Sequence, residues 1–212
     1  MNPAGQPQKT RDRVVTYIDG FNLYYGLKER GWQRYMWLDL KQLSHRLLKP
    51  HQRMMMTKYF TSRVSAPKDK AGRQNTFLEA LGTLPKFQIF YGNYQMNLRR
   101  CVHCGKSDRI PNEKMTDVNI ATEMLTDAFL DKFDTALLIS ADGDLETPVR
   151  QIAGMKGKRI IVIFPPKRHS FKLEQVATAT MIMGRGHLAT SQLPKKIKKP
   201  DGYVLTRPTK WR

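Results

Sequence analysis

Cysteine and acidic residues are scarce in this sequence. The two cysteines, Cys101 and Cys104, cannot form a disulfide framework, and a chain of 212 residues needs none to hold a core together. Asp and Glu number 18 against 37 Lys and Arg, which gives a formal net charge of +19. Such a field attracts polyanions, and phosphate backbones add affinity by releasing counterions. We therefore expect nucleic acid as the partner; the alternatives are a basic surface kept for solubility or an anionic membrane.

Long apolar runs are also absent. No stretch approaches the roughly 20 apolar residues of a membrane span, and the first 13 residues lack the apolar run of a signal peptide. No basic amphipathic helix supports attachment to a membrane surface. These absences lead us to expect a protein of the cytoplasm that has no membrane partner.

The expected organisation is one domain with appendages. Residues 1–12 are polar and contain Pro and Gly, which predicts a flexible arm before a domain that spans residues 13–190. Residues 95–114 interrupt the domain with basic residues and the cysteine pair, and we expect an inserted hairpin or loop there. Residues 191–212 form a basic tail that we expect on the surface.

Short apolar segments alternate with amphipathic ones along the domain. Five segments rich in β-branched and aromatic residues are predicted strands, at 14–18, 54–60, 87–94, 135–140 and 159–164. Helical spacing of apolar residues predicts helices at 38–48, 75–84, 117–129 and 144–153. Right-handed βαβ crossovers then favour a mainly parallel, five-stranded sheet of α/β class with helices on both faces. Sites in such sheets lie at the carboxyl ends of the strands.

Four aspartates occupy positions where this topology places chemistry. Asp19 ends the first predicted strand, Asp142 and Asp144 directly follow the fourth, and Asp117 opens a helix. Each alone is explained as a cap or turn residue. Together they concentrate negative charge at one sheet edge of a basic protein, and a divalent cation would offset the repulsion. Oxygen ligands suit Mg²⁺ or Mn²⁺ better than zinc, and either ion activates water next to a phosphate.

Three segments resemble the NYN domains of the LabA-like group, which are relatives of the PIN nucleases. They are YIDGFNLYYGL at 17–27, EKMTDVNIATEMLTDAF at 113–129 and LLISADGDLETPV at 137–149. The resemblance extends from residue 13 to about residue 190, with the segments in the same order. It implies a three-layer α/β/α, PIN-like fold and metal-dependent hydrolysis of phosphodiester bonds, usually in RNA.

The resemblance also implies roles for single residues. Asp19, Asp117 and Asp142 would bind the metal or position the water, and Asp144 would complete the acidic pocket. Asn22 either caps the first helix or contacts phosphate. Ser140 would hold the ligands in position without binding the metal itself. The intact acidic set favours a ribonuclease, with a non-catalytic RNA-binding protein as the alternative. An aspartate phosphatase would need a second Asp at position 21, where Phe21 stands.

The cysteine pair has the CxxC spacing of half a zinc knuckle. No second CxxC exists, and the remaining histidines are isolated. Unmetallated thiols are therefore our first interpretation, a zinc half-site at Cys101 and Cys104 the second and a redox function the third. A zinc site shared between two subunits would require a homodimer.

Basic residues near the acidic segments are candidate phosphate contacts. Lys114 comes first because it lies three residues before Asp117. Four further candidates adjoin aromatic residues, which stack on unpaired bases in many RNA-binding sites: Arg99, Arg100, Lys167 and Arg168.

Overall fold

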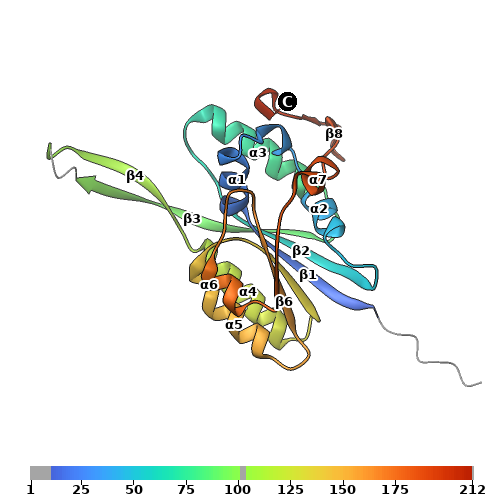
Figure 1. Cartoon of the computed structure of the whole chain (residues 1–212). Coiled ribbons are helices and arrows are strands. Elements are labelled where there is room, and N and C mark those ends of the chain that lie inside the picture. The colour runs from blue at the N-terminus through green and yellow to red at the C-terminus, as the bar shows by residue number, and fades with distance from the viewer. Residues whose placement is uncertain (1–10, 101–103, 212) are drawn as a thin grey trace, which may run out of the picture.

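The structure is a computed structural model that describes residues 11–100 and 104–211. In this part of the chain, seven strands form one sheet in the order β4-β3-β2-β1-β5-β6-β7, with helices on both faces (Figure 1). The strands are β1 (Asp12–Asp19), β2 (Gln52–Ser62), β3 (Phe87–Arg100), β4 (Ser107–Lys114), β5 (Thr135–Ile139), β6 (Arg159–Phe164) and β7 (Ala179–Ile182).

Helices complete the three layers. One face carries α1 (Gly20–Glu29), α2 (Leu40–Arg46), α3 (Lys68–Gly82) and α7 (Arg185–Ala189). The other face carries α4 (Thr116–Phe129), α5 (Glu146–Gly154) and α6 (Phe171–Val176). The predicted three-layer α/β/α fold is therefore confirmed. None of the described helices combines the length and apolarity needed to span a membrane.

The predicted number of strands is wrong. Within the seven-stranded sheet that the structure describes, six strands pair in parallel, and β4 pairs antiparallel with β3. The parallel strand missing from the prediction is β7, which has four residues at the sheet edge and is not fully buried. An edge strand of this length leaves too weak an apolar pattern to be recognised in the sequence.

Alternate residues of β1 enter two cores. Val14 and Ile18 pack on the face of α1, α2 and α3, whereas Val15 and Tyr17 pack on the face of α4 and α5. All five residues of β5 are buried, as expected for a strand covered on both faces. The sheet therefore holds the ends of β1 and β5 rigidly side by side.

The insertion at residues 95–114 is a two-stranded ribbon. Strand β3 continues beyond the sheet to Arg100 and pairs with β4 from Asn93↔Lys114 to Arg100↔Ser107. Figure 1 shows this ribbon extending away from the three layers. The ribbon leads the chain back to α4, the helix that carries Asp117.

The C-terminal segment, expected on the surface, also contributes two side chains to the core. Strands β8 (Lys196–Lys198) and β9 (Val204–Thr206) form a hairpin, and a 3₁₀ turn (Thr209–Trp211) follows. Leu205 and Trp211 are buried, and the Trp211 ring lies 5.8 Å from Phe77 and 6.4 Å from Trp37. Four lysines of the segment stay exposed, because the hairpin buries its apolar side: Lys195, Lys196, Lys198 and Lys210.

A buried ion pair fixes α4 to the sheet. Lys58 of β2 is 5% exposed, and its Nζ lies 2.6 Å from Glu123 Oε2 and 2.5 Å from Asp127 Oδ2. The Tyr17 hydroxyl donates to Asp127 Oδ2 at 2.7 Å, and Lys132 Nζ lies 3.1 Å from Oδ1. Burial raises the pKa of Asp127, but the bonds from Lys58, Tyr17 and Lys132 outweigh it and lower the pKa overall. The ionised form is therefore the stable one.

We predict that Lys58→Met destabilises the fold by about 3 kcal/mol, because it leaves a buried carboxylate without its main partner. Lys132→Met is the matched control: it removes the exposed lysine on the same carboxylate and should cost under about 1 kcal/mol. Urea denaturation of both variants measures the difference. Equal losses would contradict the assigned role of Lys58.

Candidate metal centre

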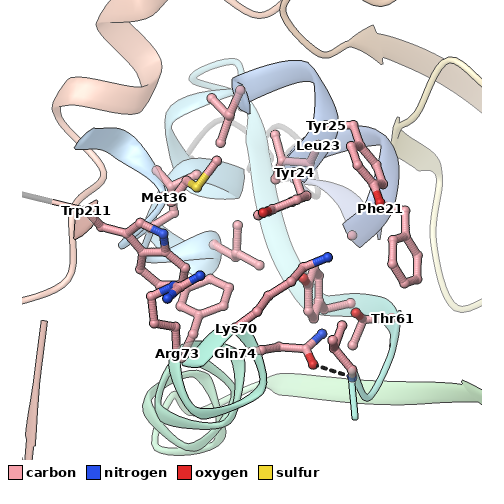
Figure 2. A pocket seen from close by; sticks show the side chains of 17 residues that line it. Phe21, Leu23, Tyr24, Tyr25, Met36, Thr61, Lys70, Arg73, Gln74 and Trp211 are labelled. Atoms are coloured by element: carbon pink, nitrogen blue, oxygen red, sulfur yellow. Dashed lines mark hydrogen bonds between the residues drawn. The ribbon is translucent and has the colours of Figure 1, made fainter. Parts of the chain in front are cut away.

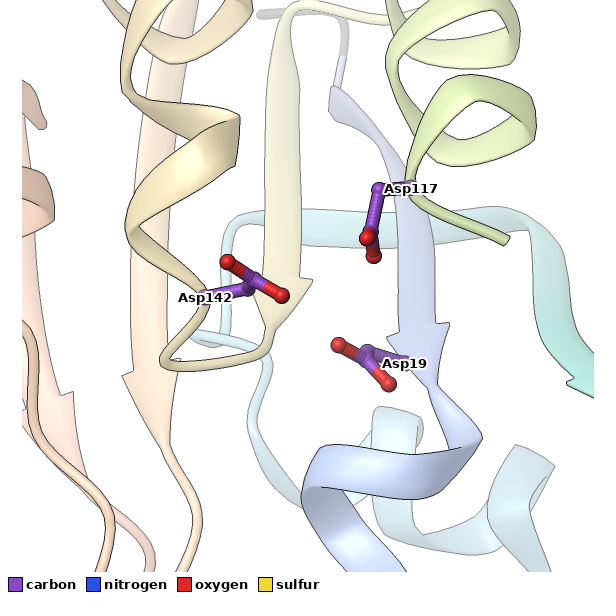
Figure 3. A group of neighbouring side chains, drawn as sticks. All are labelled: Asp19, Asp117 and Asp142. Atoms are coloured by element: carbon purple, nitrogen blue, oxygen red, sulfur yellow. The ribbon is translucent and has the colours of Figure 1, made fainter. Parts of the chain in front are cut away.

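Three of the four predicted aspartates meet at the carboxyl edge of the sheet. Asp19 is the last residue of β1, and Asp142 follows the neighbouring strand β5, which pairs with β1 up to Ile18↔Ile139. Asp117 lies in the first turn of α4. Each offers a carboxylate oxygen, and these oxygens all lie within 4.8 Å of one another. Figure 3 shows the three side chains pointing into one shared space.

Asp19 is the most constrained of the three. Its carboxylate is 1% exposed, and its Oδ1 accepts from the backbone N–H groups of Phe21 and Asn22, both at 3.0 Å. Its Oδ2 accepts from Asn22 Nδ2 at 2.6 Å and Ser140 Oγ at 2.8 Å. Asp19 thereby caps α1 while its orientation in the site is fixed.

The environment of Asp19 raises its pKa. Burial is the main cause, and the negative charge of Asp142 acts in the same direction, whereas the bonds from Asn22 and Ser140 lower the pKa. Ionising Asp19 in the metal-free protein therefore costs free energy. A cation bound between the carboxylates would remove that cost.

Ser140 connects two of the aspartates. It is fully buried; its hydroxyl donates to Asp19 and accepts from the backbone N–H of Asp142 at 3.0 Å. The Ser140 side chain thus fixes the position of the Asp19 carboxylate relative to the loop after β5. Any movement of that loop would disturb Asp19 through the same hydroxyl.

The structure tests one of the two roles considered for Asn22, that of helix cap. Asp19 occupies the N-cap position, so the interpretation of Asn22 as the helix cap is wrong. The Asn22 amide instead donates to Asp19, which makes Asn22 a support for a candidate ligand. A phosphate contact by Asn22 stays a prediction.

Asp144 lies outside the cluster of three carboxylates. It is exposed on a 3₁₀ turn (Gly143–Leu145), and its backbone N–H donates to Asp142 Oδ1 at 2.9 Å. Asp142 is the cap of that turn. In this geometry the backbone of Asp144, rather than its carboxylate, contacts the cluster.

The predicted basic contacts are only partly described. Lys114 lies in β4 and Arg99 lies in β3, but the structure does not describe their side chains. Arg100 is exposed and its Nε donates to the Gly105 carbonyl. Lys167 is exposed, whereas Arg168 forms an ion pair with Glu29. Contact of these residues with phosphate stays a prediction.

Zinc binding by the cysteine pair stays a prediction. Cys104 is a free, exposed thiol, whereas Cys101 and His103 lie outside the described residues.

A pocket that the sequence did not predict lies beside the candidate metal centre. It opens between α1, α3 and the C-terminal turn (Figure 2). Gly20 and Phe21, the two residues that follow Asp19, belong to its lining. The spacing of Phe21, Tyr24 and Tyr25 on one side of α1 was the available signal. Its other walls come from distant segments, so the spacing alone did not reveal it.

Comparison with known proteins agrees with this architecture. A family model described as NYN domain matches residues 13–183, which confirms the resemblance seen in the sequence. The 6-hydroxy-3-succinoylpyridine 3-monooxygenase HspA of Pseudomonas putida is 26% identical over 97% of this chain and 76% of its own length. A crystal structure of a Vibrio parahaemolyticus protein of unknown function matches with a TM-score of 0.57 and 19% identity, covering 89% of this chain and 100% of that chain. At this identity the second likeness concerns the fold alone.

We predict that millimolar Mn²⁺ raises the melting temperature and that Asp142→Asn abolishes the rise, because a ligand held by the native state stabilises it. Without metal, Asp142→Asn should melt no lower than the parent, since one charge that repels Asp19 is gone. Asp144→Asn is the matched control, with the same charge change two residues away, and should keep the rise. Thermal melts with EDTA and with Mn²⁺ up to about 10 mM make the comparison. Identical shifts in both variants would refute the proposed ligand set.

Proposed function

Because the chain belongs to the NYN domain family, within the PIN-like nuclease superfamily, we propose that it is a divalent-metal-dependent nuclease. The observation that carries the proposal is the cluster of Asp19, Asp117 and Asp142. The three carboxylate oxygens lie within 4.8 Å of one another, and an all-oxygen donor set suits Mg²⁺ or Mn²⁺.

The residues of the chain have distinct tasks in this mechanism. Asn22 and Ser140 hold Asp19 in one orientation, so the site is formed before substrate arrives. Asp117 and Asp142 are half-buried, and their carboxylates point into the same space as that of Asp19. A bound Mg²⁺ or Mn²⁺ would supply an activated water and stabilise charge on the scissile phosphate.

The proposed substrate is RNA. The net charge of +19 supports a polyanionic partner, and the exposed lysines of the C-terminal segment would add contacts with the phosphate backbone. The cytoplasm is the proposed location. An RNA-binding protein without turnover is the form of the proposal that would survive an absence of cleavage.

A second candidate function is that of a monooxygenase acting on a small aromatic compound. Two observations favour it: the likeness to a Pseudomonas putida protein named as a pyridine-compound monooxygenase, and the aromatic pocket beside Asp19. Such a reaction would require O₂ and a reductant such as NADH. Consumption of both with a hydroxypyridine substrate would support it, whereas nuclease activity requires neither.

We predict that the protein shortens labelled single-stranded RNA with Mn²⁺ and leaves it intact with EDTA. Asp142→Asn should reduce the cleavage rate by about 100-fold or more, because loss of a metal ligand removes several kcal/mol of transition-state stabilisation. The variant should still shift RNA in a gel, since its fold and basic surface are unchanged. A labelled DNA of the same sequence tests the choice of substrate.

Two outcomes would contradict this prediction. Cleavage that persists in Asp142→Asn would point to a contaminating nuclease or to another site. A parent protein that binds RNA but never shortens it would favour the binding protein.

A further inference from the structure

The pocket between α1, α3 and the C-terminal turn combines an aromatic wall with a cationic mouth. Its cavity of about 80 Å³ has room for several water molecules, which is space for a planar ring. Three aromatic residues of α1 belong to one wall, at positions i, i+3 and i+4: Phe21, Tyr24 and Tyr25. Trp211 lies on the opposite side in Figure 2, and Phe77, which also lines the pocket, packs against it. A flat, unsaturated ligand matches these walls better than a branched aliphatic one.

The aromatic rings lie in two groups that face each other across the pocket. The Phe21 and Tyr25 rings stack with centroids 6.4 Å apart and planes 22° apart, and Tyr24 meets Tyr25 edge-on at 5.2 Å. On the far side, Trp211 and Phe77 meet at 90°. Such surfaces are the platforms on which proteins stack unpaired bases.

Positive charge gathers where the ligand would enter. Lys70 Nζ lies 5.7 Å from the centre of the Tyr24 ring, and no carboxylate of the described residues lies within ion-pair distance of it. Figure 2 shows its side chain reaching across the pocket. Arg73 also lines the pocket, but it forms an ion pair with Asp69 at 2.7 Å. An adjoining cleft adds further basic residues, of which the last lies 3.4 Å from the same carboxylate: Lys28, Arg34 and Lys210. Lys70 is therefore the cation best placed for a phosphate attached to the ring.

The pocket and the metal centre share the start of α1. Gly20 lines the pocket next to Asp19, and a Cβ on Gly20 would lie 2.7 Å from both Phe60 O and Tyr59 Oη. The chain therefore packs tightly against β2 at this point. A ligand in this pocket would contact Phe21, which is two positions after Asp19 in the chain.

We infer that this pocket binds one unpaired nucleobase of the substrate strand, with the attached phosphate near Lys70, and so brings a neighbouring phosphodiester to the three aspartates. The inference rests on the proposed nuclease function. A free nucleotide has the same ring and phosphate, so the experiment includes both sources. An aromatic carboxylate, the kind of compound that the second candidate function would require, is an outcome of the test.

The test measures binding in EDTA, so that its result does not depend on cleavage. Fluorescence anisotropy would follow short single-stranded RNAs that carry one abasic site at successive positions. Loss of the base at one position should weaken binding about 5-fold or more, as expected for one stacked base. Nucleoside monophosphates, inorganic phosphate and pyridine-3-carboxylate are tested as competitors.

Matched variants assign the effect to the pocket. Tyr24→Phe keeps the ring and should retain affinity, whereas Tyr24→Leu keeps apolar volume without a stacking surface and should lose about 5-fold. Lys70→Gln should weaken binding more than Lys68→Gln, which removes an equal charge from an exposed position of α3 outside the pocket. Melting temperatures verify that each variant is folded.

The outcomes separate the inference from the nuclease proposal. A position-specific abasic effect that Tyr24→Leu abolishes supports the inference, even where the protein cleaves nothing. Competition by nucleotides that depends on Tyr24 and Lys70 supports the same pocket with a free nucleotide as the source. Equal binding of all abasic RNAs overturns it, and so does competition by pyridine-3-carboxylate without competition by nucleotides. Cleavage with no abasic effect would leave the nuclease proposal intact and remove only the base pocket.

Discussion

The arrangement of the site depends on the hydrogen bonds to one buried carboxylate, that of Asp19. Its two oxygens accept from the first turn of α1, from Asn22 and from Ser140, so β1, α1 and the end of β5 converge on a single group. These bonds stabilise the ionised form but do not outweigh the cost of its burial. Burial of Asp19 therefore orders the carboxyl edge of the sheet and also leaves an ionised carboxylate there that a cation would stabilise.

The acidic cluster was predictable because it follows from topology. Parallel strands end at the same edge, so an aspartate at the end of β1 and another directly after β5 had to lie close together. The central strands were predictable for a related reason, since burial on both faces imposes continuous apolar runs. Asp144 shows the limit of this argument: being close in sequence to Asp142 does not determine where its carboxylate points.

Features that depend on distant contacts could not be predicted. The side chain of Asn22 bonds to Asp19 rather than capping the helix, and only the three-dimensional path of α1 reveals this. Strand β7 has four residues and little burial, so its pairing with β6 leaves no apolar signature. The pocket walls come from α1, α3 and Trp211, and no local pattern records that these segments meet.

The packing of Trp211 has a consequence for the motions of the protein. Its contacts with Trp37 and Phe77 join segments far apart in the chain, and the segment that carries it is a two-stranded hairpin followed by one 3₁₀ turn. Segments with few backbone partners open at lower free energy than a central sheet. Local opening of the C-terminal turn would remove one wall of the pocket while the sheet and its three aspartates stayed folded. Ligand entry could then be much faster than global unfolding.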